Sequence, residues 1–326
     1  MRIFKTTPNW NFLGRKKIAL AISTVFLLAS LGGLIAKGLT YGIDFRGGTL
    51  IQIKFLEKPQ LESIRELFQD EIKTAVNITT FGQAEDNEVI VTLSLDAIKG
   101  RAGQLTDMIS KILEKRFQSF DIRRVETVGP KVGDQLKTKA IQAAFFVLIG
   151  ILAYIGFRFK VRYGVAAVVA LFHDVLITLG IFVFLEKEFT LTIVAAVLTI
   201  IGYSLNDTIV VFDRVRENVA RFPKRPMEEV INISVNESLS RTILTSVTTF
   251  LVVFALYTLG GEIIHDFCFA MLIGLLVGTY SSVFVASPVV LYFDPASLAR
   301  NKTYLRLEKA VQGFRSPFSK SKKKKA

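Results

Sequence analysis

The sequence is poor in cysteine and histidine, the side chains that most often bind metals or form covalent links. Its 326 residues contain one cysteine, Cys268, and two histidines. A lone cysteine inside an apolar run predicts neither a disulfide nor a metal site. The stretch 37–138 also lacks a Walker-type phosphate loop and a Gly-x-Ser-x-Gly nucleophile motif. We therefore expect no metal, no organic cofactor and no enzyme active site in that stretch.

Polar residues are too few for an ordinary soluble protein, because 51% of the residues are apolar. A membrane-spanning helix needs about 20 mainly apolar residues. Six runs meet this requirement and predict a polytopic α-helical membrane protein with six transmembrane helices, at 18–36, 139–157, 163–185, 190–212, 242–260 and 267–292. The first run is longer than the apolar core of a cleaved signal peptide, so we interpret it as an anchor. The last run is long enough to tilt or to contain a break.

The formal net charge of +13 is unevenly distributed along the chain. Residues 40–138 carry 14 Lys and Arg against 15 Asp and Glu, so the basic excess lies beside the spans and in the C-terminal tail. If the spans alternate, all the basic clusters face one side, and the positive-inside rule places both termini in the cytoplasm. This pattern favours a membrane protein over a nucleic-acid-binding protein. The predicted parts are a cytoplasmic N-terminus (1–17), the first helix (18–36), an extracytoplasmic domain (37–138), a five-helix bundle (139–293) with a cytoplasmic connection (213–241), and a basic cytoplasmic tail (294–326). Within the connection, the amphipathic stretch 227–239 is expected to lie along the membrane interface.

The extracytoplasmic stretch alternates between strand and helix patterns. Apolar and polar residues alternate as in half-buried strands within 41–55, 77–81, 87–95 and 120–129. Apolar residues recur at helical spacing within 59–75 and 101–117. The resulting order, β-α-β-β-α-β, predicts a ferredoxin-like α+β domain.

The fourth span contains an ionisable group well inside the apolar run. If the span covers 191–212, Asp207 lies roughly 8 Å from the midplane. A carboxylate at this depth costs several kcal/mol unless it is protonated or paired, so it is a functional candidate. Its neighbours on one helical face form a polar stripe of Thr192, Thr199, Tyr203 and Asn206. We interpret the stripe as a proton-handling site, and the alternative is a hydrogen-bonded packing seam.

Two neighbouring spans carry further polar residues. The third contains His173 and Asp174 about halfway along, and Asp174 is expected to face the same polar seam as Asp207. These two residues form either a relay or gate, or a structural pair. Arg241 stands at the cytoplasmic end of the fifth span, and its guanidinium is expected either to reach toward Asp207 or to serve as an anchor. The span itself carries a polar face of Thr245, Thr248 and Thr249.

Two other patterns indicate close packing rather than proton transfer. The segment after the first span contains Tyr41, Gly42, Asp44, Gly47 and Gly48, in which the two adjacent glycines predict a bend or a close backbone approach. Asp44 is either a lock between domain and membrane or a carboxylate that caps a turn. The last span repeats small residues every four positions, which predicts close helix packing at Ala270, Gly274, Gly278, Ser282 and Ala286.

The motifs together resemble one family. They are YGIDFRGGT (41–49), VGPKVG (128–133), GFRF (156–159), LFHDVLITLGIF (171–182), IGYSLNDTIVVFDRVREN (201–218) and SRT (240–242). The chain resembles the SecF family, membrane subunits of bacterial protein export that are related in fold to the resistance-nodulation-division transporters. The resemblance implies a multi-pass protein of the bacterial inner membrane that uses the proton gradient rather than a cofactor to promote late steps of export.

The resemblance also implies partners and roles for particular residues. The expected partners are SecD, the SecYEG channel, YajC and YidC, unfolded exported polypeptide and membrane lipid. The family's intramembrane acid falls on Asp207 and its basic partner on Arg241. Two other readings stay open at this point. One is a passive assembly subunit without proton flux. The other is an intramembrane aspartyl protease using Asp174 and Asp207, which is weakened because neither residue lies in a Gly-x-Gly-Asp motif.

Overall fold

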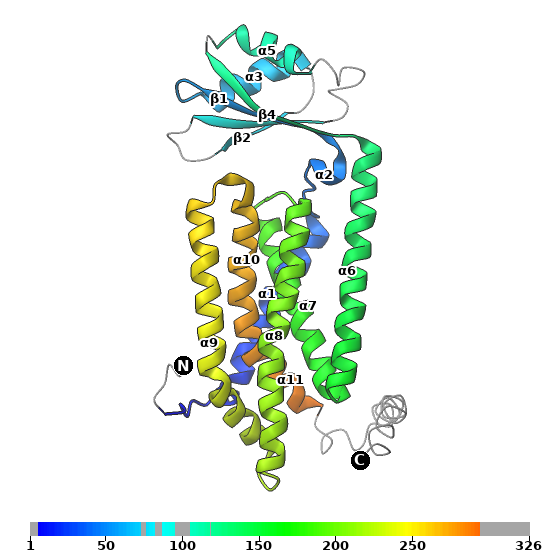
Figure 1. Cartoon of the computed structure of the whole chain (residues 1–326), viewed down its shortest axis with the longest axis vertical. Coiled ribbons are helices and arrows are strands. Elements are labelled where there is room, and N and C mark those ends of the chain that lie inside the picture. Colours follow the sequence, from blue (N-terminus) through cyan, green and yellow to red (C-terminus); the bar gives the residue numbers. More distant parts are fainter. Residues whose placement is uncertain (1–5, 73–75, 82–86, 95–104, 118, 294–326) are drawn as a thin grey trace, which may run out of the picture.

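A bundle of long helices lies below a small α+β domain (Figure 1). The computed structural model describes residues 6–72, 76–81, 87–94, 105–117 and 119–293, so the predicted basic tail lies outside the described residues. Six helical segments in the described part of the chain are long and apolar enough to cross a membrane, as predicted. They are α1 (Lys16–Ala36), α6 (Pro130–Arg158), α7 (Val161–Phe184), α8 (Leu191–Arg221), α9 (Met227–Leu259) and a last segment that begins with α10 (Glu262–Ser281).

The predicted cytoplasmic connection, 213–241, is largely helical. Within it α8 continues to Arg221 and α9 begins at Met227. Pro226 forms the N-cap of α9, a position where its missing N–H costs nothing. The amphipathic stretch is the first part of α9, and its apolar side is buried within the protein at Val230, Ile231 and Val235. Its place at the membrane interface stays a prediction.

The N-terminal residues are fastened to this first part of α9. The Oδ1 atoms of Asn236 and Asn232 accept hydrogen bonds from the backbone N–H groups of Trp10 and Phe12, both at 2.9 Å. Both asparagine side chains also donate to the carbonyl oxygen of Trp10, at 3.0 and 2.9 Å. A short 3₁₀ turn (Leu13–Arg15) then leads into α1.

The last span contains a break, as its length allowed. After α10 the chain forms a π-helical turn (Ser282–Ala286) and then the short helix α11 (Ser287–Tyr292). Pro288 cannot donate a backbone hydrogen bond, which favours such an irregular turn just before it. The Ser287 hydroxyl donates to the carbonyl oxygen of Ser282 at 3.0 Å and so satisfies one carbonyl group of the wider turn.

The α+β domain, hereafter the sheet domain, has one sheet covered by two helices. Its elements follow the predicted chain order: β1 (Gly48–Phe55), α3 (Leu61–Ile72), β2 (Val76–Phe81), β3 (Glu88–Leu93), α5 (Leu105–Glu114) and β4 (Phe120–Val128). The four strands are antiparallel in the order β2-β3-β1-β4. Alternate residues of β1 and β3 point toward the helices and form the core with Ile64 and Phe68 of α3. The β-α-β-β-α-β order is observed, whereas the assignment of the domain to the ferredoxin-like fold stays a prediction.

Candidate functional site

Asp207 lies where three helices meet. It is on α8, its side chain is 7% exposed, and its Oδ2 atom accepts a hydrogen bond of 3.2 Å from the Ser246 hydroxyl of α9. Ser246 also exchanges a hydrogen bond of 2.8 Å with Thr279 of α10. Neither residue was predicted, although Ser246 falls within the threonine-rich face of the fifth span. The carboxyl group is thus the end of a hydroxyl chain that joins α8, α9 and α10.

A pocket of about 590 Å³ lies between α8 and α9 and is lined by Asn206, the residue before Asp207, whereas Asp207 itself lines a separate and much smaller space. We call the larger space the α8–α9 pocket. Its lining contains most of the predicted polar stripe, namely Thr199, Tyr203, Asn206, Thr245, Thr248 and Thr249. Tyr203 and Thr249 join the two helices across it through a hydroxyl–hydroxyl hydrogen bond of 2.9 Å. The Thr245 and Thr248 hydroxyls donate to carbonyl oxygens of their own helix. These side chains can surround water without leaving backbone groups unpaired.

The side chain of Arg241 is exposed, and no ion pair joins it to Asp207 among the residues that the structure describes. Its positive charge is still close enough to act on the Asp207 carboxyl. A third carboxylate, Asp213, is paired at the end of the same helix, at 2.7 Å from Arg158 and 3.3 Å from Arg216.

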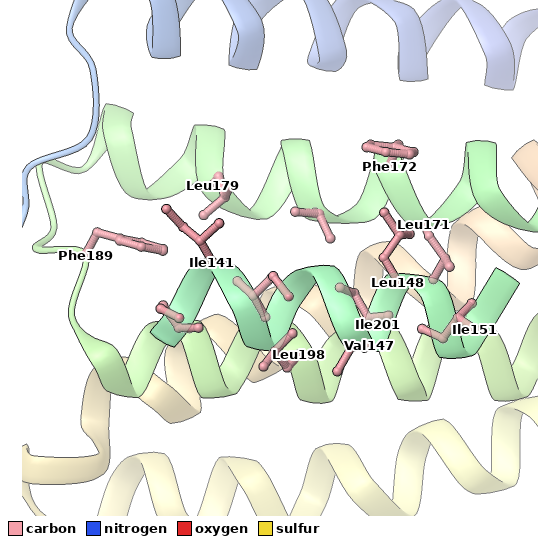
Figure 2. Close-up of a pocket in the computed structure, with 15 residues that line it drawn as sticks. Ile141, Val147, Leu148, Ile151, Leu171, Phe172, Leu179, Phe189, Leu198 and Ile201 are labelled. Carbon is pink, nitrogen blue, oxygen red and sulfur yellow. The ribbon is translucent and has the colours of Figure 1, made fainter. Parts of the chain in front are cut away.

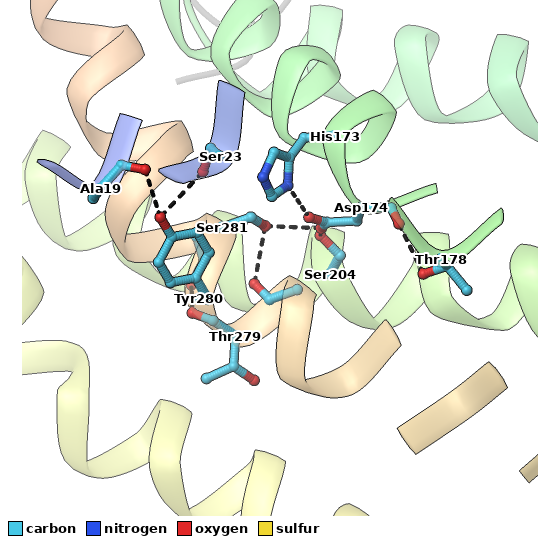
Figure 3. Close-up of polar contacts among 11 residues, drawn as sticks. Ala19, Ser23, His173, Asp174, Thr178, Ser204, Thr279, Tyr280 and Ser281 are labelled. Carbon is cyan, nitrogen blue, oxygen red and sulfur yellow. Dashed lines mark hydrogen bonds and ion pairs between the residues drawn. The ribbon is translucent and has the colours of Figure 1, made fainter. Parts of the chain in front are cut away.

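A second buried cluster surrounds Asp174 on α7 (Figure 3). We call it the Asp174 cluster. Asp174 is 1% exposed, and its Oδ1 atom lies 2.8 Å from Nδ1 of His173. Its Oδ2 atom accepts hydrogen bonds from the hydroxyls of Ser204 on α8, at 2.5 Å, and Ser281 on α10, at 2.8 Å. Both oxygens therefore have hydrogen-bond partners. Ser204, which donates to Asp174, also lines a small space with Asp207, so the cluster adjoins Asp207 through α8.

The Asp174 cluster also reaches the first helix. The ring of His173 stacks on Tyr280 of α10 with a centroid distance of 6.2 Å. The Tyr280 hydroxyl donates to the carbonyl oxygen of Ala19 at 2.8 Å and lies 3.1 Å from the hydroxyl of Ser23 (Figure 3). The buried Nε2 atom of His173 has no hydrogen-bond partner in the described structure. This cluster joins α1, α7, α8 and α10.

Two glycines of α10 allow the helices to approach between the two aspartates. A Cβ atom on Gly274 would lie 2.4 Å from the side chain of Ile200. One on Gly278 would lie 3.2 Å from Cβ of Ser204 and 3.5 Å from Oδ2 of Asp174. The remaining space near Asp207, Ser204 and Gly278 is about 10 Å³, which is room for about one water molecule at most. Ser282, the third predicted packing residue, is fully buried in the π turn.

The motif that follows α1 attaches the sheet domain to the start of α8. Asp44, in the short helix α2 (Ile43–Arg46), accepts a hydrogen bond of 2.8 Å at Oδ2 from the backbone N–H of Leu191, the first residue of α8. A carboxylate there satisfies an unpaired N–H and interacts favourably with the helix dipole. The backbone N–H of Gly42 donates to the carbonyl oxygen of Phe189 at 3.1 Å, and Tyr41 forms an isolated bridge with Phe189. Asp44 therefore caps a backbone N–H group and, through the same hydrogen bond, joins the segment before the sheet domain to the start of α8.

The adjacent glycines after α2 have a conformational reason. Gly47 has φ of 73° and Gly48 has φ of 147°, values that other residues rarely adopt. A Cβ atom on Gly48 would also lie 2.5 Å from the carbonyl oxygen of Leu93, so strand β3 could not pair as closely with β1. The pair lets the chain turn from α2 directly into the sheet.

Glu188, in the loop before α8, forms a second contact between the sheet domain and the bundle. Its Oε1 atom accepts a hydrogen bond of 3.2 Å from the side-chain amide of Asn77 in β2. Burial raises the pKa of Glu188 above its usual value, an effect that the Asn77 hydrogen bond and the nearby Arg46 partly oppose. The sequence pattern did not single out this residue, because one acid in a short polar loop carries no signal.

Two family models match the chain. The model described as "Protein export membrane protein SecD/SecF, C-terminal" matches residues 108–295, and the "SecD/SecF GG Motif" matches residues 32–55. Among curated proteins, the protein translocase subunit SecF of Magnetococcus marinus is 44% identical over 311 residues, covering 91% of this chain and 96% of that one. The corresponding subunit of Vibrio alginolyticus is 43% identical, covering 89% and 91%.

Solved structures of larger proteins are also similar. The crystal structure of SecDF from Thermus thermophilus, a translocon-associated membrane protein, has a TM-score of 0.80 and 36% identity over 89% of this chain. A SecDF structure in a super-membrane-facing form has a TM-score of 0.67 and 33% identity over 92% of the chain. The chain spans only 39% and 41% of these two proteins.

Proposed function

We propose that this chain, which belongs to the SecD/SecF family as a SecF-type protein translocase subunit, uses the proton gradient to promote export. Membership of this family makes it a membrane protein of protein export rather than an enzyme. Association with SecD follows from the same family and from the SecDF neighbours. The observation that carries the proposal is the buried Asp207 at the end of a hydroxyl chain across three helices, with Tyr203 and Asn206 of the same helix lining the α8–α9 pocket.

In the proposed cycle a proton enters through the α8–α9 pocket and binds to Asp207. Neutralising this carboxyl weakens its attraction for the Ser246 hydroxyl, which can then turn fully toward Thr279. Loss of the proton restores the attraction. Moving one charge through 100 mV is worth about 2.3 kcal/mol, so a few protons can bias two arrangements of α8 and α9.

The movement would reach the sheet domain through the start of α8. Asp44 and Glu188 hold the domain to the residues that lead into this helix. A shift of α8 therefore displaces the domain, which we propose binds unfolded polypeptide outside the cytoplasm. No cofactor is needed for this step, since the proton itself is the coupling ion.

Arg241 acts in this proposal at one stage only. It is exposed beside the bundle and free of an ion pair with Asp207 in the structure. Rotation of the first part of α9 would bring it toward the carboxylate and favour release of the proton. His173 and Asp174 would serve mainly as the fixed pivot, because both oxygens of Asp174 are already bound.

The location and remaining partners belong to the same proposal. Basic residues lie at the end of the bundle remote from the sheet domain, so we place both termini in the cytoplasm and the chain in the bacterial inner membrane. We further propose SecYEG, YajC and YidC as neighbours in the assembly. The exposed α8–α9 pocket must be covered by protein or water in a bilayer, and SecD helices are the proposed cover.

The test compares export in membrane vesicles that carry Asp207→Asn, Arg241→Ala or the control Asp213→Asn. We expect Asp207→Asn and Arg241→Ala to abolish the gradient-dependent part of export, with normal levels of the SecD complex. Asp213→Asn, which removes a carboxylate six residues further along α8, should keep most of it. Gradient-dependent export that survives in Asp207→Asn would instead favour a passive assembly subunit.

The protease alternative has no geometric support. An aspartyl protease needs two carboxyl groups that share one water molecule. Here Asp174 is occupied by His173, Ser204 and Ser281, and no hydrogen bond joins it to Asp207.

A further inference from the structure

A second pocket lies next to the α8–α9 pocket, and Leu198 of α8 lines both of them. It has a volume of about 300 Å³ and lies between α6, α7 and α8 (Figure 2). All fifteen residues that line it are apolar, among them Ile141, Ala144 and Ile151 of α6 and Phe172 of α7. Ile141 is 62% exposed and Phe172 is 54% exposed, so the pocket opens sideways toward the membrane. We call it the α6 groove.

The dimensions of the α6 groove match one leaflet of a bilayer. Its lining on α6 extends from Ala140 to Ile151, which is about 16 Å along the helix. The apolar core of a bilayer is about 30 Å thick, so one leaflet accounts for about half of this. The groove begins near the sheet domain end of α6, where Phe189 in the loop before α8 also lines it.

The lining decides which occupant the groove favours. Water is a poor occupant, because an apolar cavity offers it no hydrogen-bond partners. A hydrocarbon chain matches the wholly apolar lining, and the surrounding membrane supplies it.

A cation lies directly above the groove on the same face of α6. Lys137 precedes Ala140 and Ile141 by three and four residues, which places it on the lining face of the helix. Its ammonium group lies over the ring of Tyr41, 5.4 Å from the centroid, and it forms no ion pair within the described part of the chain. Lys139 carries the same charge but lies one and two residues from these positions, on another face.

From these observations we propose that the α6 groove binds one acyl chain of a phospholipid, with Lys137 against the phosphate of an anionic headgroup. The lipid would fill the space between α6 and the rest of the bundle in the leaflet next to the sheet domain. Because α6 continues from strand β4, the lipid would support the helix that carries the sheet domain. This site is independent of proton transfer at Asp207.

The test uses the full chain, alone and with SecD, in vesicles that contain phosphatidylglycerol or phosphatidylcholine with a photoactivatable group in one acyl chain. Labelled peptides are mapped by mass spectrometry. We expect phosphatidylglycerol to label 140–151 and the facing part of α7 in preference to the rest of α6. Ala144→Trp, which fills the groove, should lower this labelling at least fivefold. The matched control Ala143→Trp, whose side chain points about 100° away, should change it less than twofold.

The headgroup contact has its own pair of variants. Lys137→Gln should abolish the preference for phosphatidylglycerol over phosphatidylcholine, whereas Lys139→Gln should keep it. The proposal is overturned if both Trp variants label alike, or if label is spread evenly over outward residues such as Phe145 and Ile149. It is also overturned if a photoreactive residue at 144 is cross-linked to another protein, because a partner helix would then occupy the site. Loss of export in Asp207→Asn has no bearing on any of these outcomes.

Discussion

The two buried aspartates sit on neighbouring helices, yet their surroundings differ in kind. Asp174 is enclosed, and three side chains from three helices bind its two oxygens. Asp207 receives one hydroxyl at 3.2 Å, and the preceding residue, Asn206, lines the α8–α9 pocket. A carboxylate with three hydrogen-bond partners from packed helices holds those helices in place, whereas one with more free acceptor capacity can change its charge more readily. The difference separates a structural acid from a candidate proton site, although both lie in the membrane.

The strongest challenge to this comparison is to remove each carboxyl group in turn. Asp174→Ala leaves His173 Nδ1 and the Ser204 hydroxyl without their acceptor, at about 1–3 kcal/mol each. We expect a loss of about 2–6 kcal/mol in unfolding free energy, measured in mixed micelles. Asp207→Ala leaves Ser246 still bonded to Thr279, so its cost should stay near 1 kcal/mol. Equal losses in the two variants would show that the acids have the same structural role.

A smaller effect is expected at the start of α8, the helix that carries both Ser204 and Asp207. Asp44→Ala removes the cap from the Leu191 N–H and should cost about 0.5–2 kcal/mol. Amide hydrogen exchange should accelerate in the first turn of α8. Asp44→Asn is the matched variant, since asparagine caps as well as aspartate and should restore protection. Unchanged exchange in Asp44→Ala would mean that other contacts hold the start of α8.

The smallest expected effect is a pH dependence that does not come from the intramembrane acids. Burial raises the pKa of Glu188, so the docked sheet domain favours its neutral carboxyl. The docking that buries Glu188 should therefore be strongest below the usual pKa of 4.5 and weaken as the pH rises through the raised value, although the Asn77 hydrogen bond itself favours the ionised carboxylate. Nearby Arg46 opposes this shift, and Asp266 and Asp44 add to it.

This dependence can be read from the distance between spin labels at Thr80 and Leu259, introduced in a Cys268→Ser background. The wild-type distance distribution should broaden as the pH rises, whereas Glu188→Gln, which stays neutral, should give one distribution at every pH. A pH response that persists in Glu188→Gln would assign the titration to another group. Either result separates the pH response of the domain junction from that of Asp207.

The sequence predicted what depends on local pattern. Long apolar runs gave the six spanning helices, because a bilayer requires them, and alternation gave the order of strands in the sheet domain. Helical spacing gathered Tyr203, Asn206 and Thr249 around one pocket. It could not show that Asp174 faces Ser204 and Ser281, since the rotation of one helix against another depends on packing between distant segments.

One other miss has a physical cause of its own. Ser246 was missed because a hydroxyl amid threonines has no distinct signal until its partner is known. The Leu191 N–H that Asp44 caps lies 147 residues further along the chain. The sequence alone therefore could not show that the cap and the lock are one and the same contact.

The attachment of the N-terminus to α9 limits how that helix can move. Four hydrogen bonds tie Trp10 and Phe12 to Asn232 and Asn236, only five residues before Arg241. Any rotation of α9 that carries the Arg241 guanidinium inward must either move residues 10–12 with it or break these hydrogen bonds. The N-terminal residues, which carry no family motif, would thus limit how far Arg241 can rotate in the proposed cycle.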